Sequence, residues 1–229
     1  AYQFRFLDFA SALAITPGTP VSGDLTPANE SDLYQFSVVA GEKYFFDTQA
    51  RSGAGNARWR LIDPFNNVVF EGSFNSINSD VDTLTLTRPG TYTLLIEGRF
   101  FDTGSGIYTF NVVPVVDAAP VSVTVGETVS GSIAVQGERD TYTFNLTNDS
   151  RLYFDSITNN SSINWMLTGP SGTVVSNRAF TNSDSVDIGN PVLNLVAGDY
   201  LLSVDATGDV TGAYQFRFLD FASALAITP

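Results

Sequence analysis

Residues 21–36 read VSGDLTPANESDLYQF, and residues 129–144 read VSGSIAVQGERDTYTF. Both stretches begin with V-S-G, pass through an acidic turn and end in a D-x-Y-x-F run. An alternation of apolar and polar residues with period two is typical of a strand that has one buried face. The correspondence between the stretches predicts two related β domains in one chain.

The same correspondence continues along the rest of the two halves. The segment WRLIDPFNNVV (59–69) matches WMLTGPSGTVV (165–175), and PGTYTLLIEG (89–98) matches AGDYLLSVDA (197–206). Short alternating strands separated by Gly and Pro turns are typical of a sandwich or barrel. We therefore predict an all-β fold of two tandem antiparallel β-sandwich domains, jelly-roll or Ig-like, with seven to nine strands each.

A second, much stricter repeat covers the two ends. The sequence AYQFRFLDFASALAITP occupies residues 1–17 and again residues 213–229, an interval of 212 residues. Either the chain spans slightly more than one period of a 212-residue repeat, or it is a fragment cut to overlap itself, and both imply a parent chain in which the unit recurs. The predicted parts are a closing strand and connector of a preceding repeat (1–17), domain 1 (18–115) and domain 2 (116–229).

The first copy of this segment is predicted to be a strand with no domain of its own. An isolated apolar strand is unstable in water and needs a sheet to join. That sheet belongs either to an upstream domain of the same chain or to a neighbouring molecule, by β-augmentation. Copies joined head to tail, as a tandem array or filament, are the expected partners. The residues assigned to this assembly strand are Tyr2, Phe4 and Phe6 in the first copy and Tyr214, Phe216 and Phe218 in the second.

Composition limits the function classes. The chain has no His and no Cys, which removes His-dependent triads, thiol catalysis and the commonest transition-metal ligands. Its net charge of −13 disfavours binding to nucleic acid and to anionic membranes. No run of 18 apolar residues predicts a membrane span, so membrane insertion is not expected. We expect the chain not to be an enzyme and to need no cofactor, with calcium as the one exception considered.

Calcium is considered because oxygen-bearing side chains recur at matched positions in both halves. An N-S-D loop occurs at 78–80 and 182–184, and each loop is followed by another acid. Calcium takes six to eight oxygen ligands. The competing interpretation, which we favour, is that these side chains cap turns by accepting backbone N–H bonds. The candidate ligands are Asp32, Asp47, Asn78, Asp80, Asp82, Asp140, Asp155, Asn182, Asp184 and Asp187.

Aromatic side chains offer a second kind of candidate site. Trp59 and Trp165 stand at matched positions, each at the start of a W-x-L run. A strand-borne Trp at such positions is more often part of a core than a platform for a ligand. The loop Arg99–Phe101 carries two adjacent Phe residues, which form either an exposed patch or a plug beneath the loop.

The matched segments resemble bacterial pre-peptidase C-terminal-type domains, whose pattern runs from a D-x-Y-x-F strand to a closing G-x-Y-x-F strand. The resemblance implies a jelly-roll-like sandwich that serves as an accessory, spacer or adhesive module, and some members of the family bind calcium. Asn66 and Asn67 depart from it, because the family prefers Gly in that turn. The pattern is carried by Asp32, Tyr34, Phe36, Asp47, Leu61, Pro64, Gly90, Tyr92, Gly106, Tyr108 and Phe110, and again by Asp140, Tyr142, Phe144, Asp155, Leu167, Pro170, Gly198, Tyr200, Gly212, Tyr214 and Phe216.

Two functions remain open. The first is a structural or adhesive tandem-repeat module of an extracellular fibre, stalk or giant protein at the bacterial cell surface. The second is a carbohydrate- or protein-binding accessory module of a secreted enzyme. Exposure of the two Trp side chains separates them, because buried indoles remove the best support for carbohydrate binding.

Overall fold

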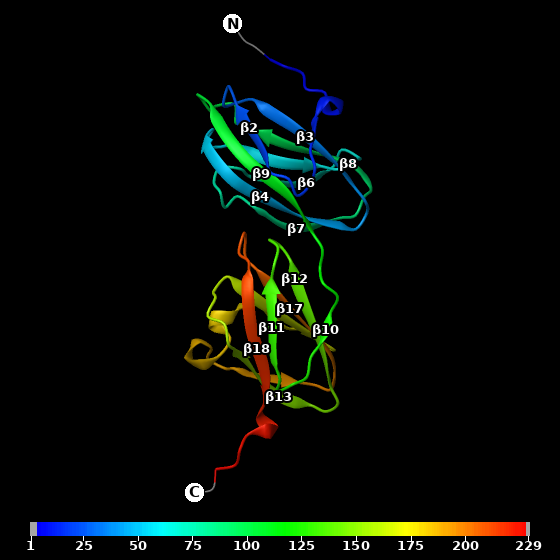
Figure 1. Cartoon of the computed structure of the whole chain (residues 1–229), viewed down its shortest axis with the longest axis vertical. Helices are drawn as coiled ribbons and strands as arrows, with labels where there is room; N and C mark the ends of the chain where they lie inside the picture. The colour runs from blue at the N-terminus through cyan, green and yellow to red at the C-terminus, as the bar shows by residue number, and fades with distance from the viewer. Residues whose placement is uncertain (1–3, 228–229) are drawn as a thin grey trace. The chain divides into compact units, whose positions relative to one another are not determined.

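The computed structural model describes residues 4–227 and divides the chain into two compact units, Ala1–Val116 and Asp117–Pro229 (Figure 1). We call these units domain 1 and domain 2. Within the segment assigned to a preceding repeat on sequence grounds, Leu13–Ala14 pair with a strand of domain 1.

Domain 1 is built from two sheets that face each other. The five-stranded sheet has the order β1-β3-β8-β5-β6, and the four-stranded sheet has the order β2-β9-β4-β7. The strands are β1 (Leu13–Ala14), β2 (Val21–Leu25), β3 (Ser31–Val38), β4 (Glu42–Gly53), β5 (Arg58–Ile62), β6 (Val68–Ser73), β7 (Val81–Leu86), β8 (Gly90–Glu97) and β9 (Gly106–Val115).

Domain 2 repeats this plan strand for strand. Its five-stranded sheet has the order β10-β12-β17-β14-β15, and its four-stranded sheet has the order β11-β18-β13-β16. The two halves therefore share one topology, and the predicted all-β sandwich fold is confirmed. The strands are β10 (Val121–Ser122), β11 (Thr128–Ile133), β12 (Arg139–Leu146), β13 (Ser150–Ser156), β14 (Ile163–Gly169), β15 (Gly172–Ala179), β16 (Val192–Leu195), β17 (Gly198–Ala206) and β18 (Gly212–Asp220).

One strand pair in each domain departs from the predicted antiparallel arrangement. Strand β1 lies parallel to β3, and β10 lies parallel to β12. The chain leaves the five-stranded sheet after the first strand, forms one strand of the other sheet, and returns. Two reversals of direction bring the third strand back parallel to the first, which a period-two pattern cannot reveal.

Short 3₁₀ helices occur outside the ladders. The two copies of D-F-A-S form the same one, η1 (Phe9–Ser11) and η4 (Phe221–Ser223). In each, the preceding Asp accepts a hydrogen bond from the backbone N–H two residues later, at 3.0 Å for Asp8 and 2.9 Å for Asp220. This helix forms in both copies although their surroundings differ, so its formation depends on the D-F-A-S sequence itself. Helices η2 (Phe180–Asn182) and η3 (Ser185–Asp187) belong to the loop before β16.

Each domain has its own aromatic core between the two sheets. In domain 2 the rings of Phe154 and Trp165 are stacked with centroids 3.9 Å apart. In domain 1 the equivalent rings, Phe46 and Trp59, meet edge to face at 6.3 Å. Burying one such side chain contributes about 1.5–3 kcal/mol, so the alternation of large apolar residues is what holds the sheets together.

Candidate functional site

A chain of three polar side chains joins the two sheets of each domain at the edge of the core. In domain 1 the Tyr108 hydroxyl donates to the Asp32 carboxylate at 2.5 Å and lies 2.6 Å from the Tyr34 hydroxyl. Strand β3 carries Asp32 and Tyr34, whereas β9 of the opposite sheet carries Tyr108. A carboxylate only accepts hydrogen bonds, so Tyr108 donates to Asp32 and accepts from Tyr34.

Domain 2 contains the same chain. The Tyr214 hydroxyl donates to Asp140 at 2.6 Å and lies 2.7 Å from the Tyr142 hydroxyl. Burial raises the pKa of Asp140, and it likewise raises the pKa of Asp32, although the tyrosine hydrogen bond opposes the shift in each case. Two of the candidate calcium ligands are thus bound to tyrosines inside the fold.

A glycine in each domain makes room for the tyrosine hydroxyls. A Cβ at Gly131 would lie 2.3 Å from the Tyr142 hydroxyl oxygen and 2.4 Å from that of Tyr214. The matching Gly23 would place its Cβ 2.5 Å from the hydroxyl oxygen of Tyr108. The glycine of the V-S-G run and the tyrosines of the D-x-Y and G-x-Y runs therefore form one structural unit.

The N-S-D loops also do the same structural work in both domains. The Asp80 carboxylate accepts from the Thr48 backbone N–H at 2.9 Å, and the Asp184 carboxylate accepts from the Ser156 N–H at 2.7 Å. In domain 1 the bond falls where the β4–β9 ladder carries a bulge, between Thr48 and Ala50. These bonds reach backbone N–H groups 32 and 28 residues away in the sequence, so they are long-range contacts with strands and not the local turn caps of the competing interpretation.

The other candidate ligands are divided among several contacts. Asp47 accepts from the Gln49 side chain at 2.8 Å, and Asp155 pairs with Arg217 at 2.6 Å. Carboxylate oxygens of Asp47 and Asp80 lie within 4.8 Å of each other.

The remaining candidate ligands lie in the loops. Asp82 accepts from the Thr83 N–H at 2.7 Å. Asn78 donates its backbone N–H to Ser76, Asn182 ends η2, and Asp187 ends η3.

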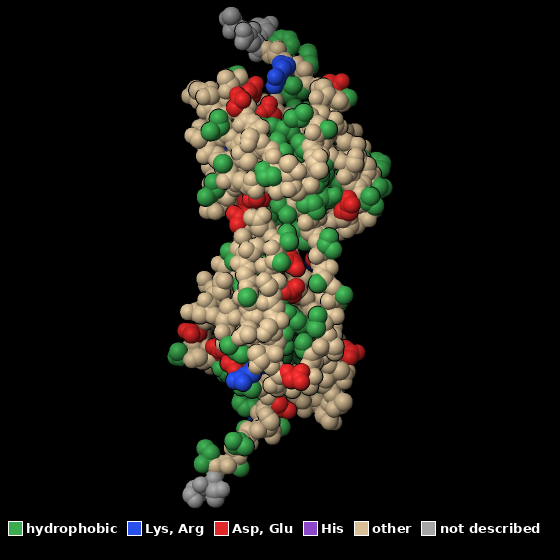
Figure 2. Space-filling view, viewed as in Figure 1, with side chains coloured by type: hydrophobic (Ala, Val, Ile, Leu, Met, Phe, Trp, Pro, Cys, Tyr) green, Lys and Arg blue, Asp and Glu red, His purple; other side chains and the backbone are tan. Residues whose placement is uncertain are grey.

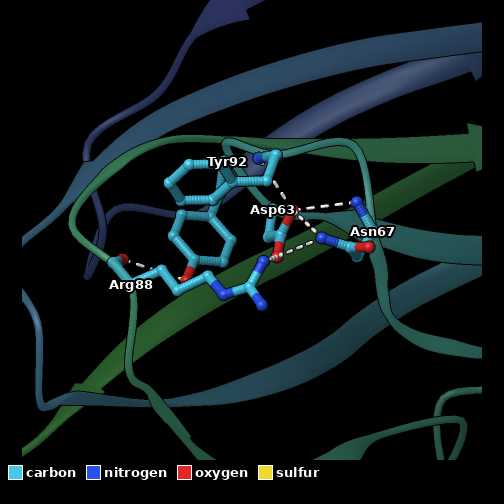
Figure 3. Close-up of polar contacts among 5 residues, drawn as sticks. Asp63, Asn67, Arg88 and Tyr92 are labelled. Carbon is cyan, nitrogen blue, oxygen red and sulfur yellow. Dashed lines mark hydrogen bonds and ion pairs between the residues drawn. The ribbon is translucent and has the colours of Figure 1, made fainter.

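An ion pair that the sequence did not reveal holds two turns of domain 1 together (Figure 3). Asp63 accepts from the backbone N–H groups of Phe65 and Asn67, both at 2.8 Å, and from Arg88 at 2.7 Å. The Tyr92 hydroxyl donates to the Arg88 carbonyl at 3.0 Å. The turn signal Asp63-Pro64 is visible in the sequence, but a charge 25 positions away cannot be assigned to it without the fold.

The pKa of Asp63 follows from these contacts. Burial acts to raise it, but the hydrogen bonds from Asn67 and Phe65 and the charge of Arg88 outweigh burial and hold the pKa below its ordinary value. The position is not shared, because domain 2 has Gly169 there. A Cβ on Gly169 would lie 2.3 Å from the Tyr200 ring.

Both tryptophans belong to the cores. Trp59 is 0% exposed and Trp165 is 1% exposed, which confirms the core interpretation. The Trp165 indole N–H donates to Ser183 of the N-S-D loop at 2.7 Å. Neither indole can act as a platform for a sugar ring in this fold, so the best support for carbohydrate binding is lost.

The loop Arg99–Asp102, here called the aromatic loop, is exposed. Phe100 is 82% exposed and Phe101 is 50% exposed, so the two rings form a patch and not a plug. Asp102 anchors the loop by accepting from the Asn56 side chain at 2.7 Å and from the Arg99 N–H at 3.2 Å. The Arg99 guanidinium lies 5.4 Å from the centroid of the Phe101 ring.

Charge is spread thinly over the surface. Figure 2 shows acidic side chains scattered over the visible faces of both domains, with few basic ones among them. This matches the excess of 24 acidic over 11 basic residues. Among residues 4–227, no helix is long and apolar enough to cross a membrane.

The two copies of the 17-residue segment differ in structure. In the second copy, Tyr214, Phe216 and Phe218 lie in β18 and are buried in the core of domain 2. In the first copy, residues 4–8 form no strand, and Phe4 and Phe6 are 74% and 92% exposed. Tyr2 lies outside the described residues. Strand formation here therefore depends on the partners β11 and β13, and not on the segment itself.

Comparisons with known proteins give only distant likenesses. No family model matches the sequence, and no curated protein sequence matches it. Among solved structures, the pre-peptidase C-terminal domain of a collagenase from Bacillus anthracis is similar at 17% identity and a TM-score of 0.34, over 44% of this chain and 94% of that one. The periplasmic lysozyme inhibitor PliG from Aeromonas hydrophila is similar at 9% identity and a TM-score of 0.35, over 44% and 95%. The CUB1-EGF-CUB2 domains of rat MASP-1 are similar at 8% identity and a TM-score of 0.29, over 91% and 99%.

Proposed function

We propose that the chain is a repeating unit of a longer extracellular protein of the bacterial cell surface, and that its paired sandwiches act as structural or adhesive modules. The observation that carries the proposal is that two halves with diverged sequences keep one strand order and one Asp–Tyr–Tyr chain. A unit copied for its fold keeps the contacts that maintain the fold, as is usual in tandem-repeat proteins.

The use of the polar side chains supports a mechanical role over a chemical one. Two of the carboxylate pairs shared by the domains, Asp32 with Asp140 and Asp80 with Asp184, accept hydrogen bonds from tyrosines or from the backbone. The third shared pair, Asp47 and Asp155, accepts from the side chains of Gln49 and Arg217. The sequence contains no His or Cys that such a carboxylate could activate. We therefore propose that this segment has no catalytic activity of its own.

The array is tested first by the gene that encodes the chain. We expect several copies of the 212-residue unit together with an export signal, and a gene holding a single unit would refute the array. Protease treatment of intact cells tests the location, since an extracellular array must be cleaved while cytoplasmic proteins stay intact.

The mechanical role is tested by pulling single molecules of the chain from both ends. Two independent sandwiches should give two unfolding events, each releasing up to about 35 nm of chain, because a domain of about 100 residues extends by roughly 3.5 Å per residue. One single event of twice that length, or none above the noise, would contradict independent load-bearing modules.

The exposed aromatic loop favours one alternative, a protein- or carbohydrate-binding accessory module. The pair Phe100→Ala and Phe101→Ala would then abolish binding to bacterial surface proteins or to immobilised glycans. Phe65→Ala is a matched control, because Phe65 is 64% exposed and also lies beside an Arg. Equal binding by both variants, or no binding by the unchanged chain, would remove this alternative.

A further inference from the structure

The structure uses opposite halves of the repeated 17-residue segment in its two copies. In the first copy the later half is structured, since Leu13–Ala14 form β1 beside β3 of domain 1. In the second copy the earlier half is structured, since β18 ends at Asp220 and closes domain 2. Neither copy, among residues 4–227, has both halves in a ladder.

The half that is left over is apolar and exposed in each case. Phe6 is 92% exposed, whereas its equivalent Phe218 is 3% exposed. Ile227 is 92% exposed, whereas its equivalent Ile15 packs against the core of domain 1. Figure 2 shows hydrophobic side chains along the exposed segment that leads to the C-terminus. Because the equivalent Phe218 is buried and the equivalent Ile15 is partly buried, the fold already contains a packed position for each of these exposed side chains.

The connection between the two domains shows how a complete segment is used. Strand β9 closes domain 1 at Val115, and six residues later β10 begins domain 2 at Val121. Strand β10 joins β12 as β1 joins β3: Val121 pairs with Tyr142 and Leu13 with Tyr34, each 21 residues further along. The following backbone bonds also match, from Val123 N–H to the Thr143 carbonyl and from Ile15 N–H to the Gln35 carbonyl, both 2.9 Å.

We propose that residues 213–229 form a junction of this kind, in which Leu225–Ile227 add as a parallel edge strand to β3 of a following copy of domain 1. This rests on the proposed function, since it requires a tandem array. The segment then serves two domains in succession: its first half closes domain 2, and its second half opens the next domain 1. Ile227 takes the place that Ile15 has here, and the ladder of the next sheet acquires its first strand.

The following domain belongs to the same chain, not to a second molecule. In a separate molecule the edge of β3 is already covered by that molecule's own Leu13–Ala14. Exchanging one strand for another of identical sequence gains no new hydrogen bond, while association costs translational and rotational entropy. In a continuous chain the segment is delivered at high effective concentration, and there is no competing copy.

The test is a two-unit chain, residues 1–229 followed directly by a second copy of residues 18–229. Ala14 and Gln35 are register partners, so Ala226→Cys in the first unit is combined with Gln35→Cys in the second unit. The chain has no natural Cys, so any disulfide comes from the introduced pair. We expect the bond to form to the extent seen for Ala14→Cys with Gln35→Cys in the 229-residue chain, because neighbouring strands bring Cα atoms within disulfide range.

Two further measurements make the result decisive. Ala226→Cys combined with Gln35→Cys in the first copy should stay reduced, because that edge is already covered. In the two-unit chain without cysteines, the Ile227 amide of the first unit should become protected from hydrogen exchange, because it should make the bond that the Ile15 amide makes to the Gln35 carbonyl. A reduced pair together with an unprotected Ile227 amide would overturn the junction. That outcome leaves the array itself standing, which only a single-copy gene would refute.

Discussion

The hydroxyl oxygens of Tyr34 and Tyr108 lie 2.6 Å apart and link the two sheets of domain 1, and Tyr142 and Tyr214 repeat the link in domain 2 at 2.7 Å. Residues 74 and 72 positions apart in the sequence are thereby held in one hydrogen-bond chain that ends on Asp32 or Asp140. These hydrogen bonds explain why both halves carry the D-x-Y and G-x-Y runs, because the two runs supply the two sides of one cross-sheet contact.

Removing the central hydroxyl of this chain should destabilise its domain. Tyr214→Phe removes the tyrosine donor to the half-buried Asp140 carboxylate, which retains a backbone hydrogen bond from Ser132, and it leaves Tyr142 without its acceptor. We therefore expect a loss of about 2–3 kcal/mol in unfolding free energy. Tyr200→Phe, which removes a bond to one backbone carbonyl, should cost about 1 kcal/mol. Thermal unfolding is followed by Trp165 fluorescence in a Trp59→Phe background. Equal losses of unfolding free energy for the two variants would show that the Asp140–Tyr214–Tyr142 hydrogen bonds stabilise domain 2 no more than a single tyrosine–carbonyl bond does.

The glycine beneath the hydroxyls should not tolerate a methyl group. Gly131→Ala places a Cβ within 2.4 Å of two tyrosine oxygens, and overpacking of this kind costs about 1–3 kcal/mol. Combining it with Tyr142→Phe removes one of the clashing atoms, so the two changes should cost less together than the sum of their separate effects. Gly189→Ala is the control, since nothing lies within 4 Å of the position that its added methyl group would take. Strict additivity would contradict the steric explanation.

The sequence predicts the parts of this fold that depend on neighbouring residues and misses those that depend on distant ones. Alternation around Tyr34 and the W-x-L run at Trp59 are local patterns, and both correctly indicate buried strand positions. The pairing of Asp63 with Arg88 joins two turns that only the fold brings together. The two-residue strand Leu13–Ala14 is too short to show any period. Phe6 has the sequence of a strand but lies in no strand, and here the 212-residue repeat, not the local alternation, predicts that a partner sheet is missing.

The N-S-D loops should stabilise the domains without calcium. Asp184→Ala removes the acceptor of the Ser156 N–H, so we expect domain 2 to lose about 1–3 kcal/mol of unfolding free energy. Asp187→Ala, an exposed change in the same loop, should have little effect. A chelator should leave the melting temperature of the unchanged chain where it is. If the chelator lowers that temperature but has no effect on Asp184→Ala, the loop binds a metal ion, because a bound ion stabilises the folded form.

Domain 1 should lose stability in acid before domain 2. Asp63 and Asp102 have pKa values below the ordinary 3.8: for Asp102 the Asn56 hydrogen bond is the main cause, and for Asp63 several hydrogen bonds and Arg88 outweigh burial. A lowered folded pKa gives stability that is present above the unfolded value and is lost as the pH falls through the folded value. Asp32 and Asp140 have raised pKa values and therefore contribute with the opposite sign, and because each domain has one such group this contribution has the same direction in both domains.

Single-tryptophan variants measure this difference directly. Trp165→Phe leaves Trp59 to report on domain 1, and Trp59→Phe leaves Trp165 to report on domain 2. Between neutral pH and about pH 3, below the ordinary Asp pKa, the melting temperature of domain 1 should fall further than that of domain 2. The side chain of Asp63→Asn cannot titrate. In the Trp165→Phe background this change should therefore reduce the difference between the two domains' acid-induced falls in melting temperature, while it lowers the stability of domain 1 at neutral pH. If the acid-induced falls in melting temperature of the two domains differ by as much in that variant as in the unchanged chain, the Asp63–Arg88 pair plays no part. A larger fall for domain 2 than for domain 1 would refute the assignment of acid sensitivity to domain 1.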